Sequence, residues 1–202
     1  MKRKTIFFMD LEGTLVEDGT FHLDEMDFIE FLIQFSKIEE MTNSKISLNL
    51  VSPVNMQDMI QVKDRMNFNI EKFNRQHHKN LQEVESAACY VENGESYKDA
   101  RIVPLSSKGE RASKYLFVKP WYELLKEKYD IVNCFYIGDG VNDYDAMQFV
   151  KDLPNGKVIC PENANEKVKS VADYVGKGQR LKGVIQAMEQ MRRQKEQEER
   201  NF

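Results

Sequence analysis

The sequence has few cysteines, prolines and tryptophans, no excess of positive charge and no long apolar run. Its 202 residues include 3 cysteines, 5 prolines and 1 tryptophan, and its net charge is −4 at pH 7. Cys89, Cys134 and Cys160 lie in or beside apolar stretches, which predicts buried free thiols in a reducing compartment rather than a disulfide framework. The negative charge gives no general attraction to nucleic acid, so we expect no nucleic-acid partner.

Membrane insertion and secretion are also disfavoured by the sequence. No segment approaches the apolar length that a transmembrane helix needs. The apolar run at residues 5–9 (TIFFM) is too short for the core of a signal peptide, and acidic residues follow it at once. We therefore expect a cytoplasmic protein without a membrane partner. With 41% hydrophobic residues, the chain has enough apolar material for the core of one domain.

What the sequence does contain is an alternation of short apolar segments with longer amphipathic ones. This alternation predicts an α/β fold, a doubly wound parallel sheet with helices on both faces. An Asn-Gly pair at residues 93–94 favours a β-hairpin over residues 87–104. The predicted strands are residues 5–9, 46–52, 132–138, 157–160 and 172–176, and the predicted helices begin near residues 24, 56, 120, 145 and 164.

The spacing of these elements indicates one domain over residues 1–202. Residues 81–112 are expected to form a small, hairpin-sized cap-like insertion, and residues 189–202 a charged C-terminal tail. No large cap fits between the predicted core elements. Any binding site at the edge of the sheet would therefore be open. Such a site suits a macromolecular substrate, or a small one enclosed by a second copy of the chain in a homo-oligomer.

Two predicted strands end in carboxylates. Residues 7–15 (FFMDLEGTL) place Asp10 and Glu12 after the first strand, and residues 136–147 (YIGDGVNDYDAM) place Asp139 and Asp143 after the third. In open parallel sheets the ligand site lies beyond the carboxyl ends of the strands. Two such acidic ends repel each other unless a cation or a proton lies between them, and Mg²⁺ suits an all-oxygen site. Asp10 taken alone is better explained by a capped turn, and it is the second acidic strand end that favours a cation site.

Ser52 and a lysine are candidates for binding an anion beside this cation site. Ser52 ends the second strand, and Pro53 suits the first turn of a helix, so the hydroxyl and the helix amides predict an anion site. An ordinary helix N-cap is the alternative. For the positive charge we favour Lys119, which precedes Pro120 at the predicted start of a helix, over its competitor Lys108.

Together these segments resemble the four motifs of the haloacid dehalogenase-like (HAD) phosphohydrolase superfamily. The matching features are DLEGTL, a serine that ends the second strand, a lysine before a helix and GDGVNDYDAM, and residues 163–188 resemble the closing segment of the sugar-phosphatase branch. The resemblance covers most of the chain. It implies a Rossmann-like core and Mg²⁺-dependent hydrolysis of a small phosphorylated metabolite, such as a sugar phosphate, through an aspartyl-phosphate.

The resemblance also implies roles for individual residues. Asp10 is the implied nucleophile, and Glu12 the acid and base that protonates the leaving oxygen and then activates water. The implied ligands of Mg²⁺ are Asp10, the backbone carbonyl of Glu12 and Asp139, with Asp143 acting through water or by orienting the others. The implied phosphate-binding residues are Ser52, Lys119, Gly13 and Thr14.

One departure keeps other functions open. Glu12 stands where the superfamily usually has aspartate, and its extra methylene moves the carboxyl group. A phosphotransferase and a non-catalytic phospholigand-binding or regulatory relative therefore remain alternatives. A signalling receiver domain also uses a phosphorylated aspartate, but its acceptor follows the third strand, whereas here the DxEGT element follows the first.

Overall fold

The chain is described by a computed structural model over residues 1–91, 102–105 and 113–200. Its strands form one 7-stranded sheet in the order β4-β3-β2-β1-β5-β6-β7, and all neighbours pair in parallel. This confirms the predicted parallel α/β fold. The strands are β1 (Arg3–Met9), β2 (Lys45–Asn55), β3 (Ser86–Tyr90), β4 (Ile102–Leu105), β5 (Asp130–Ile137), β6 (Gly156–Pro161) and β7 (Tyr174–Gly176).

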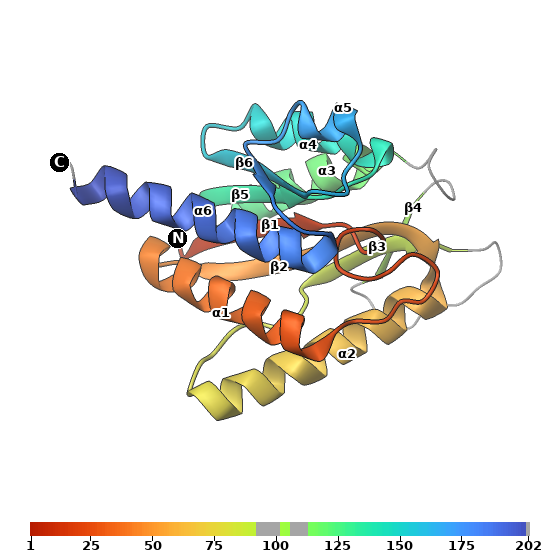
Figure 1. Ribbon diagram of the computed structural model, residues 1–202, viewed down its shortest axis with the longest axis horizontal. Helices are drawn as coiled ribbons and strands as arrows, with labels where there is room; N and C mark the ends of the chain where they lie inside the picture. The colour runs from red at the N-terminus through yellow and green to blue at the C-terminus, as the bar shows by residue number, and fades with distance from the viewer. Residues whose placement is uncertain (92–101, 106–112, 201–202) are drawn as a thin grey trace.

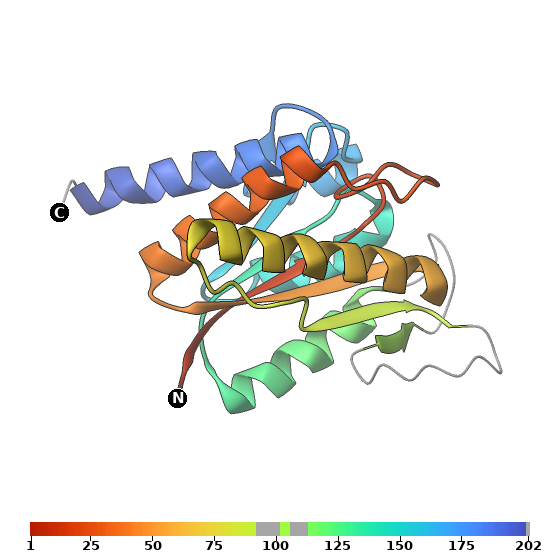
Figure 2. The ribbon, with the colours of Figure 1, turned by 90° about the horizontal axis from the view of Figure 1, so that it is seen from below.

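Helices cover both faces of the sheet (Figures 1 and 2). One face packs against α1, α2 and α6, and the other packs against α3, α4 and α5. None of the helices in the described part of the chain combines the length and the apolar character that a membrane crossing requires. The helices are α1 (Glu25–Thr42), α2 (Met56–His77), α3 (Tyr115–Lys128), α4 (Tyr144–Lys151), α5 (Glu166–Lys169) and α6 (Arg180–Arg200), with a short 3-10 helix η2 (Val141–Asp143).

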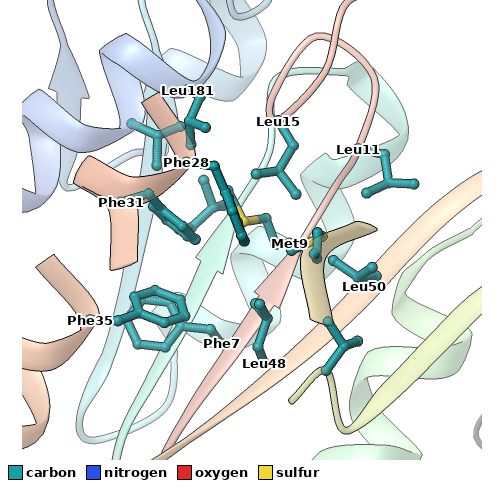
Figure 3. Packing of buried hydrophobic residues seen from close by; sticks show 14 of the residues in the cluster. Phe7, Met9, Leu11, Leu15, Phe28, Phe31, Phe35, Leu48, Leu50 and Leu181 are labelled. Atoms are coloured by element: carbon teal, nitrogen blue, oxygen red, sulfur yellow. The ribbon is translucent and has the colours of Figure 1, made fainter. Parts of the chain in front are cut away.

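The central strand β1 explains the apolar run that precedes the first acid. Phe7 and Met9 face the α1 and α6 side of the sheet, and Ile6 and Phe8 face the α3 side, all with 0% exposure. A strand buried on both faces needs apolar residues at every position. Figure 3 shows Phe7 between α1 and the sheet, where its ring stacks on Phe135 with centroids 4.5 Å apart. The core therefore fixes the strand whose end carries Asp10.

The predicted hairpin is wrong in its pairing. β3 and β4 are parallel neighbours in the main sheet, with Ala87 opposite Ile102, so the two strands do not form a hairpin. The Asn-Gly pair at 93–94 lies outside the described residues, as do residues 106–112 of the expected cap-like insertion. At the other end of the chain, residues 189–200 continue α6, where Met191 is only 6% exposed.

The helix start predicted near residue 56 is confirmed, whereas the strand end before Pro53 and the helix start at Pro120 are wrong. β2 continues through Pro53, and α2 begins at Met56, where the Asn55 side chain accepts a hydrogen bond from the backbone N–H of Asp58 at 2.9 Å. Asparagine is a strong N-cap, so it sets this boundary. Similarly, α3 begins at Tyr115 and contains Pro120. Its buried stripe already starts before the proline, with Phe117 and Val118.

Candidate active site

Three carboxylates meet where β1 and β5 end. The two strands are neighbours, and the backbone N–H of Asp10 donates to the carbonyl of Ile137 at 2.9 Å, which ties the ends together. Oxygen atoms of Asp10, Asp139 and Asp143 all lie within 4.8 Å of one another. The structure therefore brings together three of the acids that the sequence singled out, and β-sheet pairing is the reason.

A tight turn after β1 places the next residues against this cluster. The carbonyl of Leu11 accepts hydrogen bonds from the amides of Thr14, Leu15 and Val16, and Leu11 and Leu15 are buried in the core (Figure 3). The Thr14 hydroxyl donates to Asp139 Oδ1 at 2.8 Å. In this structure Thr14 thus holds Asp139, whereas the sequence suggested a contact with phosphate.

Gly13→Ala is expected to destabilise the protein and to disturb the cluster. Gly13 has φ of +71°, and a Cβ there would lie 2.1 Å from Asp139 Oδ2. The left-handed backbone alone costs an alanine about 1–2 kcal/mol, and Asp139 must move as well. Thermal unfolding should show a lower Tm than for Gly19→Ala, whose φ is +72° but whose Cβ would have nothing within 4 Å. Equal losses would mean that backbone strain alone is responsible.

Lys114 supplies the positive charge of the cluster. Its Nζ lies 2.6 Å from Asp10 Oδ2 and 2.7 Å from Asp143 Oδ1, and its side chain is completely buried. Lys114 immediately precedes α3. Lys119, which the sequence favoured for this role, lies outside the cluster, because its side chain is exposed on α3 with its Nζ 5.6 Å from the centre of the Tyr115 ring. Lys108 lies outside the described residues.

Asp143 holds the elements of the site together. Its Oδ1 accepts from Lys114 and from the Tyr136 hydroxyl, at 2.7 Å each. Its Oδ2 accepts from the backbone N–H groups of Asp139 at 3.1 Å and Gly140 at 2.9 Å. With both oxygens occupied in this way, Asp143 orients the loop that carries Asp139.

Asn163, which the sequence analysis did not single out, ties a third strand end to the site. It follows β6, and its Nδ2 donates to the carbonyl of Gly13 at 2.9 Å. Its Oδ1 accepts from the backbone N–H of Arg180 at 2.7 Å, at the start of α6. The only sequence signal was its place at the start of the segment 163–188.

The cluster opens into a cleft of about 280 Å³. Ser52 is completely buried at its wall, and its Oγ has no hydrogen-bond partner among the described residues. Since α2 begins four residues later, helix amides do not complete this anion site. Glu12 is partly exposed, and its Oε1 accepts from the Gly19 N–H at 3.1 Å. The cleft is lined by Asp10, Glu12, Asp18, Ser52, Pro53, Asp139, Gly140, Val141 and Asn142.

Burial and crowding shift the pKa values of the cluster. Burial raises the pKa of Asp10 to about 8, with a further rise from Asp143 and Asp139 and an opposing effect of Lys114. Burial likewise raises the pKa of Asp139 to about 6. Burial by itself lowers the pKa of Lys114, but Asp10 and Asp143 outweigh it, so the pKa lies above its ordinary value. The cluster thus holds more negative charge than Lys114 neutralises, and its oxygen ligands fit a hard divalent cation.

The chain is similar in structure to several solved proteins. A protein from Thermoplasma acidophilum, 0175, aligns with a TM-score of 0.50 at 14% identity, over 96% of this chain and 98% of that one. A haloacid dehalogenase-like hydrolase protein, yhjK from Bacillus subtilis, aligns with a TM-score of 0.49 at 13% identity, over 92% and 89%. The chain therefore shares its fold with the Thermoplasma protein. No protein-family model and no curated protein matches the chain.

A further similar structure is the 3-deoxy-D-manno-octulosonate 8-phosphate phosphatase from Moraxella catarrhalis, solved with magnesium ion, phosphate ion and KDO. It aligns with a TM-score of 0.46 at 15% identity, over 90% of this chain and 80% of that one. At such identities the likeness concerns the fold alone. What the chain does must be argued from its own site.

Proposed function

We propose that this HAD-like protein is a divalent-metal-dependent phosphatase that hydrolyses small phosphomonoesters through an aspartyl-phosphate on Asp10. The observation that carries the proposal is the buried cluster in which Asp10 lies 2.6 Å from Lys114 and within 4.8 Å of two further carboxylates. A carboxylate at the mouth of a cleft, beside a fixed cation, is placed to attack phosphorus. The motif resemblance gives the same assignment.

The residues of the cleft divide the remaining tasks. Lys114 stabilises charge on the phosphoryl oxygens, and the unpaired Ser52 hydroxyl donates to one of them. Glu12, on the exposed side of the cleft, protonates the leaving oxygen and then takes a proton from the attacking water. The Gly19 N–H fixes the position of the Glu12 carboxyl group. In this proposal Lys114 replaces Lys119 as the lysine of the site.

Asp10 and Asp139 are the residues proposed to bind the metal, with Asp143 orienting Asp139. The donor set is all oxygen, and burial, together with the neighbouring carboxylates, raises the pKa values of Asp10 and Asp139, so that a bound cation would favour their ionised forms. Mg²⁺ is the cation that such a site prefers when a phosphate is also bound. When bound, it supplies charge neutralisation between the attacking carboxylate and the phosphoryl group.

A phosphate-release assay with p-nitrophenyl phosphate tests the proposed function. We expect turnover with Mg²⁺ and none with EDTA. A phosphotransferase would release nitrophenol faster when an alcohol acceptor is added, with less free phosphate formed per nitrophenol. A protein that binds phosphoesters without catalysis would show saturable binding and no product, and this outcome would contradict the proposal.

Metal binding should stabilise the protein more at pH 8 than at pH 5. Asp10 has a folded pKa of about 8 against an ordinary value of 3.8, so without metal its contribution to stability is present at low pH and is lost as the pH rises through 8. Tm measured in EDTA should therefore fall between pH 5 and 8. Mg²⁺ should remove much of this fall, and an equal Mg²⁺ effect at both pH values would contradict the assignment.

A further inference from the structure

The rim of the cleft carries negative charge that the proposed metal site does not need. Of the residues that line the cleft, Glu12 and Asp18 are carboxylates outside the cluster of Asp10, Asp139 and Asp143. None of the described lining residues is a lysine or an arginine. Lys114, the lysine that contacts the cluster, is completely buried and paired with Asp10 and Asp143.

Asp18 differs from its neighbour Glu17 in its ion pairing. Glu17 is paired with Arg180, whose Nη2 lies 3.1 Å from Glu17 Oε1. Asp18 forms no ion pair within residues 1–91, 102–105 and 113–200, and it is exposed at the cleft.

Asp18 also lies on the side of the cleft where the leaving group must be. Glu12 can protonate the leaving oxygen only if the leaving group lies beside it. The turn that carries Asp18 is held to Glu12, because the next residue, Gly19, donates its N–H to Glu12 Oε1. Ser52, whose buried hydroxyl has no partner among the described residues, lines the same cleft and is the residue proposed to bind the phosphoryl group.

The charge of Asp18 is not needed to balance the other charges of the site. The three carboxylates, Lys114 and one divalent cation sum to zero, and the phosphoryl group adds its own negative charge. Asp18 then adds an unbalanced charge beside the leaving group. A negative charge at the rim of a binding site weakens the binding of a negatively charged ligand. Its effect on the stability of the fold is smaller. The other rim residues, Pro53 and the half-exposed Val141, offer an uncharged surface.

We infer that Asp18 excludes substrates with a second anionic group, so that this site hydrolyses phosphomonoesters whose leaving group is neutral or cationic. This inference rests on the proposed function and adds the substrate class to it. Sugar or polyol monophosphates without a carboxylate belong to this class, and phosphorylated sugar acids and bisphosphates do not.

A matched pair of esters tests the inference. Glycerol 1-phosphate and 3-phosphoglycerate share a carbon skeleton and differ by a hydroxymethyl group against a carboxylate. With Mg²⁺, wild-type kcat/KM should favour glycerol 1-phosphate by about tenfold or more. Where turnover of an ester is too slow, its Ki against p-nitrophenyl phosphate hydrolysis replaces kcat/KM. Added salt should reduce the preference, because Asp18 is exposed.

Two variants identify the residue responsible. Asp18→Asn should lower the preference by about threefold to tenfold, mainly through better use of 3-phosphoglycerate, and Asp18→Lys should lower it further. Asp152→Asn, an exposed carboxylate at the C-terminal end of α4, should leave the preference unchanged.

The outcomes separate this inference from the proposed function. Hydrolysis of p-nitrophenyl phosphate together with equal use of both esters, or an unchanged preference in Asp18→Asn, overturns the inference and leaves the phosphatase assignment standing. A wild-type protein that hydrolyses none of the three esters contradicts the proposed function and the inference with it.

Discussion

Asp10→Asn is expected to abolish phosphate ester hydrolysis without loss of the fold. The amide cannot form the aspartyl-phosphate, so kcat should fall by at least about 10⁴-fold, as for other catalytic nucleophiles. At pH 7.5 in EDTA the variant should unfold at the same or a higher temperature than the wild type. The reason is that burial raises the pKa of Asp10 to about 8, which means that its ionised form is disfavoured in the folded protein.

The control for this variant comes from the same motif. Asp145 follows Asp143 by two residues but is exposed on the first turn of α4 and lies outside the cluster of three carboxylates. Asp145→Asn should keep activity within about threefold, as expected of a surface change away from the site. Wild-type turnover in Asp10→Asn would contradict the nucleophile assignment. Loss of the fold in that variant would show that Asp10 is structural.

Lys114→Met should cost both activity and stability. Removing one member of a buried ion cluster leaves the others unpaired, which costs about 3–5 kcal/mol. Here the carboxylates of Asp10 and Asp143 would face each other without the Nζ that lies 2.6 and 2.7 Å from them. In a domain of this size Tm should fall by about 10 °C. Activity measured below the lowered Tm should fall by about 10²–10³-fold, the loss typical of one preorganised charge-stabilising donor.

Lys119→Ala is the matched control, since both lysines lie at or on α3 and only Lys114 is buried. It should change Tm and kcat/KM little. The double variant Asp10→Asn/Lys114→Met separates charge from packing, because it removes one charge of each sign. Its Tm in EDTA should be higher than that of Lys114→Met alone. A similar loss of activity in Lys114→Met and Lys119→Ala would overturn the assignment of Lys114.

The choice between Lys119 and Lys114 shows what local sequence signals could not predict. Proline at the first position of a helix is common, and the sequence analysis used Pro120 in this way to favour Lys119. The structure instead begins α3 at Tyr115, so that Phe117 and Val118 join the buried stripe. An apolar pattern that starts before the proline was the available signal. It would have shifted the expected helix start toward Lys114.

The pairing of β3 and β4 is a second feature that local sequence signals could not predict. The Asn-Gly pair predicted a hairpin from residues close in sequence, but β3 pairs in parallel with β2, and β4 in parallel with β3. Strand direction is set by the neighbour across the sheet and by how the connecting chain crosses over. A turn signal describes only a few residues and does not contain that information.

The sequence by itself determined the parallel α/β class and the acids at two strand ends. It could do so because a strand buried on both faces is largely apolar, as β1 is, and the acids that follow such a strand mark its end. Only the tertiary structure decided that Lys114 joins Asp10 and Asp143, that Asn163 holds Gly13, and that Asp18 lines the same cleft as Asp10. Those relations depend on contacts between segments far apart in the chain, and such contacts follow from packing the sheet and its helices into one core rather than from any local pattern.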